Sequence, residues 1–237
     1  MWGTTLRKLT ELNIGAAVRI RALPELSSWD EADQGFSDLR RHFPDNTNRM
    51  HVLLKASAID KLYSTRAGNI YWVANAVVAA MRGLEDSPGP QHANVVQVVD
   101  SISQHKTSMY PGSDRCASFA SKYCHFFLDE RVFPIYDSFA LASVKSLLGR
   151  VSRGLTRGRS EYRDFCERLD LLRVRDGLEN VGVRDMDRFL WLWGLWIAQH
   201  GREKRVINED VYDVFVSEDP DVRVLVRSLE PAVVESP

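Results

Sequence analysis

Apolar residues recur with the period of an α-helix along most of the 237-residue chain. The clearest example is the stretch 70–81, where the apolar positions are Ile70, Val73, Ala74, Val77, Val78 and Met81. Steps of three and four residues place these side chains on one face of a helix. A similar face over 50–62 precedes it, and the breaker-rich segment 85–91 ends the pair. The pattern therefore predicts two successive helices with buried faces.

The rest of the chain is also predicted to be helical. Further helices are expected near 92–105, 114–127, 137–148, 160–173 and 184–199. The last of these is apolar nearly all round, so we expect it to be buried, with Gly201 as its glycine C-cap. Alternating strand patterns are scarce. We predict an all-α fold in which 1–207 form one domain around a core at 50–200, and 208–237 form a short acidic helix and a loosely held tail.

Composition and charge exclude several classes of protein. The formal net charge is -1, so any binding to a polyanion has to come from local patches. No apolar run is long enough to span a bilayer, and the N-terminal segment lacks the apolar core of a signal peptide. The three cysteines (Cys116, Cys124 and Cys166) predict neither a disulfide framework nor a zinc site. We expect a cytoplasmic protein without a membrane partner, an obligatory protein partner, a metal or a cofactor.

The charge is distributed unevenly along the chain. The stretch 145–159 contains five cations and no acid: Lys145, Arg150, Arg153, Arg157 and Arg159. Guanidinium groups on a glycine-rich backbone suit contacts to phosphate oxygens, although a solvated basic loop has the same composition. The segment 208–237 instead carries eight acids and two arginines. The two segments cancel in the net charge, which hides a polarised sequence.

Two charged residues stand in a stretch that is otherwise apolar and aromatic. Asp137 occupies an N-cap position, where a carboxylate accepts hydrogen bonds from the first turn of a helix. Lys122 lies fifteen residues earlier on a helical face with aromatic neighbours. The structural interpretation is an ordinary cap, together with a lysine whose stem packs while its ammonium reaches water. The catalytic interpretation is a desolvated lysine nucleophile beside a carboxylate that stabilises a developing cation.

The segment "SKYCHFFLDERVFPIYDSFA" resembles the core of the helix-hairpin-helix DNA glycosylase superfamily. By this resemblance, Lys122 matches the lysine that 8-oxoguanine-type enzymes carry in the first turn of the helix after the hairpin. Asp137, in "IYDSFA", matches the aspartate that caps the next helix. The likeness extends over roughly 50–200. It is greatest to the divergent branch that holds 8-oxoguanine and archaeal glycosylases and bacterial antiviral glycosylases acting on modified phage bases.

The resemblance implies a two-lobed helical fold with a cleft, and a specific reaction. The enzyme would flip a damaged or modified base out of DNA and cleave its N-glycosidic bond, leaving an abasic site. Asp137 would stabilise the sugar cation or orient a water molecule. Lys122 would either attack C1′, forming a Schiff base that permits strand cleavage, or serve only as a binding group.

Further residues are assigned to the base and to the DNA backbone. The stretch 52–78 resembles the superfamily's helix–turn–helix, which places the polar turn "YSTR" towards a flipped base. The predicted base-pocket residues are Tyr63, Ser64, Thr65, His125 and Tyr136. Arg66 would bind a phosphate or fill the gap left by the base, and the cations of 145–159 would contact the backbone. For each aromatic residue and for His125, packing in the core is the alternative.

The chain departs from the superfamily pattern, which leaves other classes of function open. Ser118 and Ala120 stand where the hairpin glycines would be, and three scattered cysteines cannot form the four-cysteine iron–sulfur loop of some relatives. One alternative is a non-catalytic helical module that binds nucleic acid or protein through its basic loop. Another is a helical regulator or toxin-like protein whose tryptophans, such as Trp196, are purely structural. Housekeeping repair of oxidised bases is the alternative within the glycosylase class.

Overall fold

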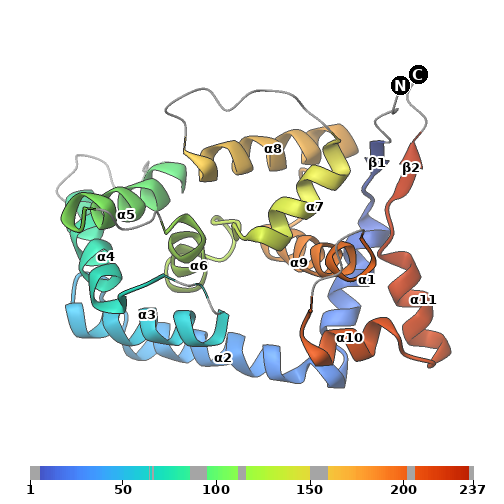
Figure 1. Ribbon diagram of the computed structural model, residues 1–237, viewed down its shortest axis with the longest axis horizontal. Helices are drawn as coiled ribbons and strands as arrows, with labels where there is room; N and C mark the ends of the chain where they lie inside the picture. Colours follow the sequence, from blue (N-terminus) through green and yellow to red (C-terminus); the bar gives the residue numbers. More distant parts are fainter. Residues whose placement is uncertain are drawn as a thin grey trace. The chain divides into compact units, whose positions relative to one another are not determined.

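The structure, a computed structural model, describes residues 6–63, 65, 67–85, 95–111, 116–149, 160–201 and 206–234. Within these residues it contains eleven α-helices, one short 3-10 helix and one two-stranded sheet (Figure 1). The predicted all-α class is confirmed, and the small sheet is an addition to it. None of the described helices combines the length and apolar composition needed to cross a bilayer.

The described chain divides into two compact units, each with its own packing. The central unit comprises 31–136 and 160–163, and the terminal unit comprises the described parts of 1–30, 137–159 and 164–237. The central unit holds α3 (Arg49–Tyr63), α4 (Ile70–Glu85), α5 (Val95–Met109), α6 (Ala117–Phe127) and most of α2 (Ser27–His42). The terminal unit holds β1 (Leu6–Lys8), α1 (Glu11–Arg21), η1 (Pro24–Leu26), α7 (Ser138–Leu148), most of α8 (Glu161–Asp176), α9 (Val183–His200), α10 (Glu209–Phe215), α11 (Pro220–Ser228) and β2 (Ala232–Val234).

In the central unit, α6 is the most deeply buried helix. It packs against α3 and α5, while α4 packs against α3 and α5. Every residue from Phe119 to Phe127 on α6 is buried, because apolar and aromatic side chains occur on all of its faces. Phe36 of α2 joins this core, with its ring stacked 4.5 Å from that of Phe126. The apolar face predicted for 70–81 is buried in α4 from Val73 to Met81, and Ile70 is half-buried.

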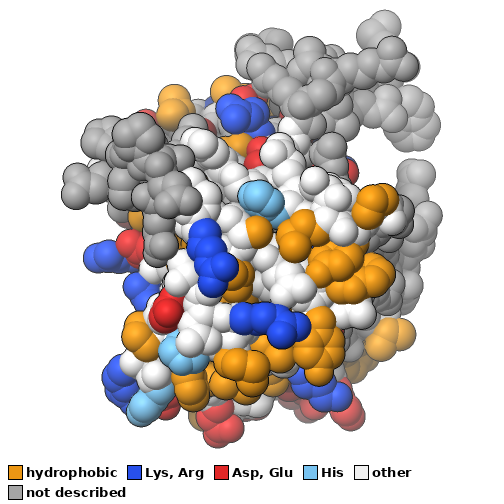
Figure 2. Space-filling view, turned by 90° about the vertical axis from the view of Figure 1, so that its left-hand side faces the viewer, with side chains coloured by type: hydrophobic (Ala, Val, Ile, Leu, Met, Phe, Trp, Pro, Cys, Tyr) orange, Lys and Arg blue, Asp and Glu red, His pale blue; other side chains and the backbone are white. Residues whose placement is uncertain are grey.

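The outer surface of α3, α4 and α5 remains partly apolar. Figure 2 views the molecule from the side on which these helices lie, and shows orange apolar side chains gathered close to blue Lys and Arg side chains. The exposed large apolar residues of these helices are Met50, Leu54, Leu62, Tyr71, Trp72 and Met109. Trp72 is partly covered, because its ring stacks on that of Tyr110 at 4.5 Å.

In the terminal unit, α9 packs against α1 and α7. Gly194 permits the close approach of α7: a Cβ atom at this position would lie 2.6 Å from the carbonyl carbon of Phe139. Two hydrogen bonds join the same helices, from Ser143 Oγ to the Leu190 carbonyl (2.5 Å) and from Trp193 Nε1 to Ser146 Oγ (2.9 Å). The predicted burial of this helix is confirmed for its middle part, from Met186 to Leu195, whereas both of its ends are only half-buried or exposed.

The C-terminal segment is more structured than its composition suggests. The sequence predicted one short helix and a loose tail, whereas the structure has α10, α11 and β2. α11 packs on α1, and β2 pairs antiparallel with β1, so that Leu6 is opposite Val234. A three-residue strand is too short to show an alternating pattern, and its partner lies at the other end of the described chain. Gly201 does end α9, but in an extended conformation (φ -71°, ψ 179°) and not in the left-handed one.

Candidate functional site

Lys122 of the central unit is held inside the protein. It is only 3% exposed, so the expectation that its ammonium reaches water is wrong. Its Nζ donates to Ser118 Oγ at 3.2 Å and lies 5.8 Å from the centre of the Tyr63 ring. Because α6 begins at Ala117, Lys122 lies in the second turn of the helix and not in the first turn that the resemblance implied. The lysine is therefore in an aromatic setting, with a hydroxyl as its neighbour.

Two of the predicted base-pocket residues contribute to the aromatic core. Tyr63 is half-buried, and its ring lies 5.4 Å from that of Phe126 and 5.8 Å from that of Phe36. His125 is buried, with its Nδ1 2.8 Å from the carbonyl oxygen of Phe133. A carbonyl oxygen can only accept, so Nδ1 is the protonated nitrogen when the ring is neutral. The structure thus brings Lys122 and Tyr63 together and anchors His125 to the backbone.

The predicted polar turn after α3 is only partly described. Thr65 Oγ1 donates to Asp60 Oδ1 at 2.6 Å, and the backbone N–H of Ala67 donates to the same oxygen at 3.2 Å. Asp60, which the sequence analysis did not single out, therefore organises this turn. Ser64 and Arg66 lie outside the described residues.

Asp137 of the terminal unit forms the predicted N-cap, which is confirmed. Its Oδ1 accepts hydrogen bonds from the backbone N–H groups of Phe139 (3.0 Å) and Ala140 (2.9 Å) at the start of α7. Its backbone is extended (φ -148°, ψ -178°), as is usual for a cap, and the residue is half-buried. These bonds fix the carboxylate at the positive end of the helix.

Tyr136 precedes this cap and belongs to the central unit. Its backbone N–H donates to Ser121 Oγ at 3.0 Å, and its hydroxyl lies 3.4 Å from Glu161 Oε2. Ser121 is fully buried on α6. The hydrogen bond therefore ties the segment before Asp137 to the helix that carries Lys122.

Most of the predicted DNA-contacting cations fall in a part of the chain that the structure does not describe. Lys145 is exposed on α7. The other four, Arg150, Arg153, Arg157 and Arg159, lie outside the described residues. Of the five cations in the basic segment 145–159, the structure therefore places only Lys145.

The structure reveals a buried polar cluster that the sequence analysis missed. Lys55 of α3 is fully buried, and its Nζ donates to Asn46 Oδ1 at 2.9 Å. The hydroxyl of Tyr123 donates to the same oxygen at 2.7 Å, and Lys55 Nζ lies 5.3 Å from the centre of the Phe127 ring. Burial lowers the pKa of Lys55 to about 8, an effect that Arg40 strengthens and the charge of Asp45 opposes.

The sequence does contain a signal for this cluster. Val52, Lys55 and Ile59 follow the helical spacing of one face, and all three are fully buried. A lysine at a core position of an apolar stripe is the signal. Asn46 and Phe127 also line an open groove of about 550 Å³, with Ser37, Arg40, Arg41, Pro44 and Leu128.

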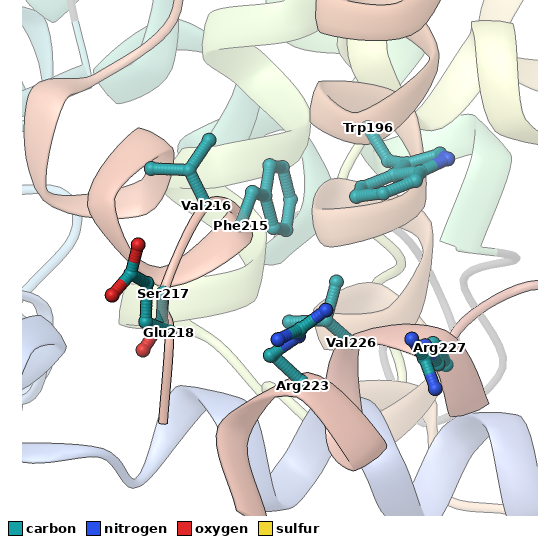
Figure 3. A pocket seen from close by; sticks show the side chains of 8 residues that line it. All are labelled: Trp196, Phe215, Val216, Ser217, Glu218, Arg223, Val226 and Arg227. Carbon is teal, nitrogen blue, oxygen red and sulfur yellow. The ribbon is translucent and has the colours of Figure 1, made fainter. Parts of the chain in front are cut away.

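A second groove, of about 410 Å³, lies in the terminal unit between the end of α9, the end of α10 and α11 (Figure 3). Trp196 and Phe215 form its aromatic wall, with ring centres 5.2 Å apart and planes nearly perpendicular. Arg223 and Arg227, the two arginines of the acidic C-terminal segment, line the opposite side. Trp196 therefore lines a groove, which the purely structural interpretation of the tryptophans did not foresee. A third, smaller groove lies beside Arg7 and Arg175.

Comparison with known proteins gives one partial match. A family model described as an N-terminal domain (HI_0787_N) matches residues 16–131, slightly less than half of the chain. The match includes Lys55 and Lys122 and ends before Asp137. Searches of curated proteins and of solved structures found no match. The family description names no activity, so the function has to be argued from the residues themselves.

Proposed function

We propose that this protein is a DNA glycosylase that flips a damaged or modified base out of DNA and hydrolyses its N-glycosidic bond. The observation that carries the proposal is the position of Asp137, whose carboxylate is fixed by two backbone N–H groups at the start of α7. The motif "IYDSFA" resembles the helix-capping aspartate signature of the helix-hairpin-helix glycosylases. A fixed carboxylate can stabilise a cation without reorganising during the reaction.

In this mechanism, the bond between C1′ and the base nitrogen breaks, and its electron pair leaves with the base. The positive charge that develops on the deoxyribose is stabilised by Asp137. A water oxygen then bonds to C1′, and its proton passes to the carboxylate or to solvent. The product is an abasic site together with the free base.

Lys122 offers a second route, in which its neutral amine attacks C1′ in place of water. The base leaves, a Schiff base forms, and β-elimination cleaves the strand. This route requires C1′ to reach the side-chain nitrogen of Lys122, a residue that is only 3% exposed and whose Nζ donates to Ser118 Oγ. We therefore propose hydrolysis by water as the main reaction and treat the lyase step as a separate test.

The class of substrate is proposed from the sequence resemblance. The branch that the chain resembles includes bacterial antiviral glycosylases, and the superfamily's hairpin glycines are replaced by Ser118 and Ala120. Without those glycines, the backbone is less able to approach a phosphate closely. These features favour an unusual substrate, such as the modified bases of phage DNA, over housekeeping repair of oxidised bases.

The decisive experiment measures the release of bases. The purified protein is incubated with DNAs carrying natural, damaged and phage-type modified bases, and the released bases are identified by mass spectrometry. Asp137→Asn should reduce release by at least about a hundredfold, because asparagine keeps the cap but removes the charge. Asp219→Asn is the matched control, since Asp219 caps α11 with the same pair of backbone bonds. If the Asp137→Asn variant released bases at the wild-type rate, the proposal would be wrong.

Borohydride trapping tests the lyase step. A covalent protein–DNA adduct that disappears in Lys122→Met and persists in Lys55→Met would identify Lys122 as the nucleophile. Lys55 is a suitable control because it is also a buried lysine near an aromatic ring. If no adduct forms on a substrate that is excised, Lys122 supports the structure and does not react.

A second candidate function is a non-catalytic helical module that binds nucleic acid. The burial of Lys122 and the exposure of Lys145 favour it, since neither observation requires a reaction. In that case, Lys145→Gln combined with glutamine at the four arginines of 150–159 would abolish DNA binding. The Asp137→Asn variant would bind DNA normally, and no base would be released from any DNA.

A further inference from the structure

The groove of the terminal unit combines an aromatic wall with two cations. Trp196 is half-buried at the end of α9, and its ring stacks on that of His200 with 3.7 Å between the ring centres. Phe215 stands nearly perpendicular to it, with its ring centre 5.2 Å away. The indole is thus held by aromatic neighbours while it also lines the groove. Aromatic surfaces of this kind stack with planar rings, including nucleobases.

The two cations lie on one face of α11. Arg223 and Arg227 are four residues apart, so they are neighbours on the helix surface, and Figure 3 shows both at the edge of the groove below Trp196. Both are exposed. Neither is within ion-pair distance of a carboxylate among the described residues. Like charges at this spacing repel each other, so an anion bound between them would relieve the repulsion.

The acidic residues near these arginines are engaged elsewhere, placed at the other end of the groove or, like Asp221 in the first turn of α11, not part of its lining. Asp219 caps α11 through the N–H groups of Asp221 and Val222, and Glu230 pairs with Arg7 at 3.0 Å. Glu218 lines the groove on the side away from Arg227 (Figure 3). A carboxylate in that place can accept hydrogen bonds from sugar hydroxyls or from the amino groups of a base.

The groove therefore offers an aromatic surface, paired guanidinium groups and a separate acceptor within about 410 Å³. Pockets for small molecules typically have volumes of about 300–1,000 Å³. We propose that this groove binds a nucleotide unit, with the phosphate between Arg223 and Arg227 and the base against Trp196. The unit can be a free nucleoside monophosphate or one nucleotide of a single strand. The proposal does not depend on the glycosylase function, because it uses no residue of that site.

The test is calorimetric titration of the full-length protein with three probes: inorganic phosphate, deoxyadenosine 5′-monophosphate and a short single-stranded oligodeoxyadenylate. We expect the mononucleotide to bind at least about tenfold more tightly than phosphate, because only the mononucleotide can also stack on Trp196. If the oligonucleotide binds and the mononucleotide does not, the nucleotide unit belongs to a strand. Equal affinity for phosphate and mononucleotide, or binding of none of the three probes, would overturn the proposal.

Three variants connect the binding to the groove. Arg223→Gln combined with Arg227→Gln should weaken binding by at least about tenfold, through loss of the charge-assisted hydrogen bonds. Trp196→Leu should weaken mononucleotide binding and leave the affinity for phosphate unchanged. Arg19→Gln is the matched control, because Arg19 is an exposed arginine in the last turn of α1 that bonds only to its own helix. Unchanged affinity in the double variant, with a normal circular dichroism spectrum, would also contradict the proposal.

The outcome for nucleotide binding can be distinguished from the outcome for base release. Asp137→Asn should bind the probes as the wild type does, since Asp137 is not among the residues that line this groove. Loss of base release with retained nucleotide binding would support both proposals. Retained base release in the double arginine variant would show that the groove is not needed for excision.

Discussion

Lys55 and Asn46 form a hydrogen bond in the interior of the central unit, with Nζ of the lysine 2.9 Å from Oδ1 of the asparagine. Lysine can only donate, so the oxygen of the carboxamide must face it, and the hydroxyl of Tyr123 donates to the same oxygen at 2.7 Å. The orientation of the carboxamide is thereby fixed. The lysine is fully buried, and no carboxylate of the described residues pairs with it. A buried ammonium with a neutral partner lowers the stability of the fold.

Replacing this lysine by methionine should therefore stabilise the protein at neutral pH. The pKa of Lys55 is about 8 in the folded state, whereas that of an unfolded lysine is about 10.4. Below pH 8, Lys55 is protonated in both the folded and the unfolded protein, so the folded protein carries the full free-energy cost of burying its charge. Between about pH 8 and pH 10.4 the unfolded chain binds more protons, so the contribution of Lys55 to stability improves as the pH rises. We expect Lys55→Met to gain about 1–3 kcal/mol at pH 7, with the gain shrinking towards zero near pH 10.

Urea unfolding at pH 7, 8.5 and 10 measures this difference directly. Lys61→Met on the same helix is the matched control, because Lys61 is exposed and should show little change at any of these pH values. A Lys55→Met variant that is less stable than the wild type at pH 7, by a margin that grows with pH, would contradict the explanation.

The two aspartate caps allow the charge of Asp137 to be separated from its structural role. Asp137→Ala and Asp219→Ala each remove two hydrogen bonds to the start of a helix, and each should lower the free energy of unfolding by about 1 kcal/mol. The asparagine variants should lose only a few tenths of a kcal/mol, since asparagine caps about as well as aspartate. Thermal unfolding of the four variants checks this. A large loss of stability in Asp137→Asn alone would mean that its effect on base release cannot be attributed to charge.

A buried serine on α6 holds the segment before the cap. Ser121 Oγ accepts from the backbone N–H of Tyr136 at 3.0 Å and donates to the Ser118 carbonyl at 3.0 Å. Ser121→Ala should cost about 1–3 kcal/mol, because it leaves a backbone donor without this acceptor. Hydrogen exchange of the Tyr136 amide should accelerate. Ser37→Ala is the control: Ser37 is exposed and donates only to a carbonyl of its own helix, so exchange at Tyr136 should not change.

The periodicity of the sequence was sufficient to predict the fold class, because a helix is a local structure. The apolar stripe at 70–81 and the apolar helix near 184–199 both appear where they were expected, as α4 and α9. The pairing of β1 with β2 depends on contacts between the two ends of the described chain, which no local pattern reports. The conformation of Gly201 also depends on its surroundings, since glycine fits an extended C-terminus as well as a left-handed one.

The sites were less predictable than the helices. The cap at Asp137 follows from a local pattern and was found, whereas the depth of Lys122 is set by packing against other helices. The groove at Trp196 was missed because its wall and its cations come from three helices, and the acidic composition of 208–237 concealed the two arginines. Lys55 had a readable signal, a cation at a core position of an apolar face, which the sequence analysis did not use.

Gly194 of the terminal unit should tolerate substitution poorly. A Cβ atom there would lie 2.6 Å from the carbonyl carbon and 2.7 Å from the Cβ atom of Phe139, so α7 and α9 would have to separate. Because backbone atoms cannot move aside as a flexible side chain can, Gly194→Ala should lower the free energy of unfolding by about 2–3 kcal/mol. Gly15→Ala is the matched control: Gly15 is also inside a helix, a Cβ atom added to it would meet nothing within 4 Å, and alanine there should stabilise by about 0.5–1 kcal/mol. Thermal unfolding of the two variants should therefore shift in opposite directions. Equal shifts would show that α7 and α9 do not approach as closely as the structure indicates.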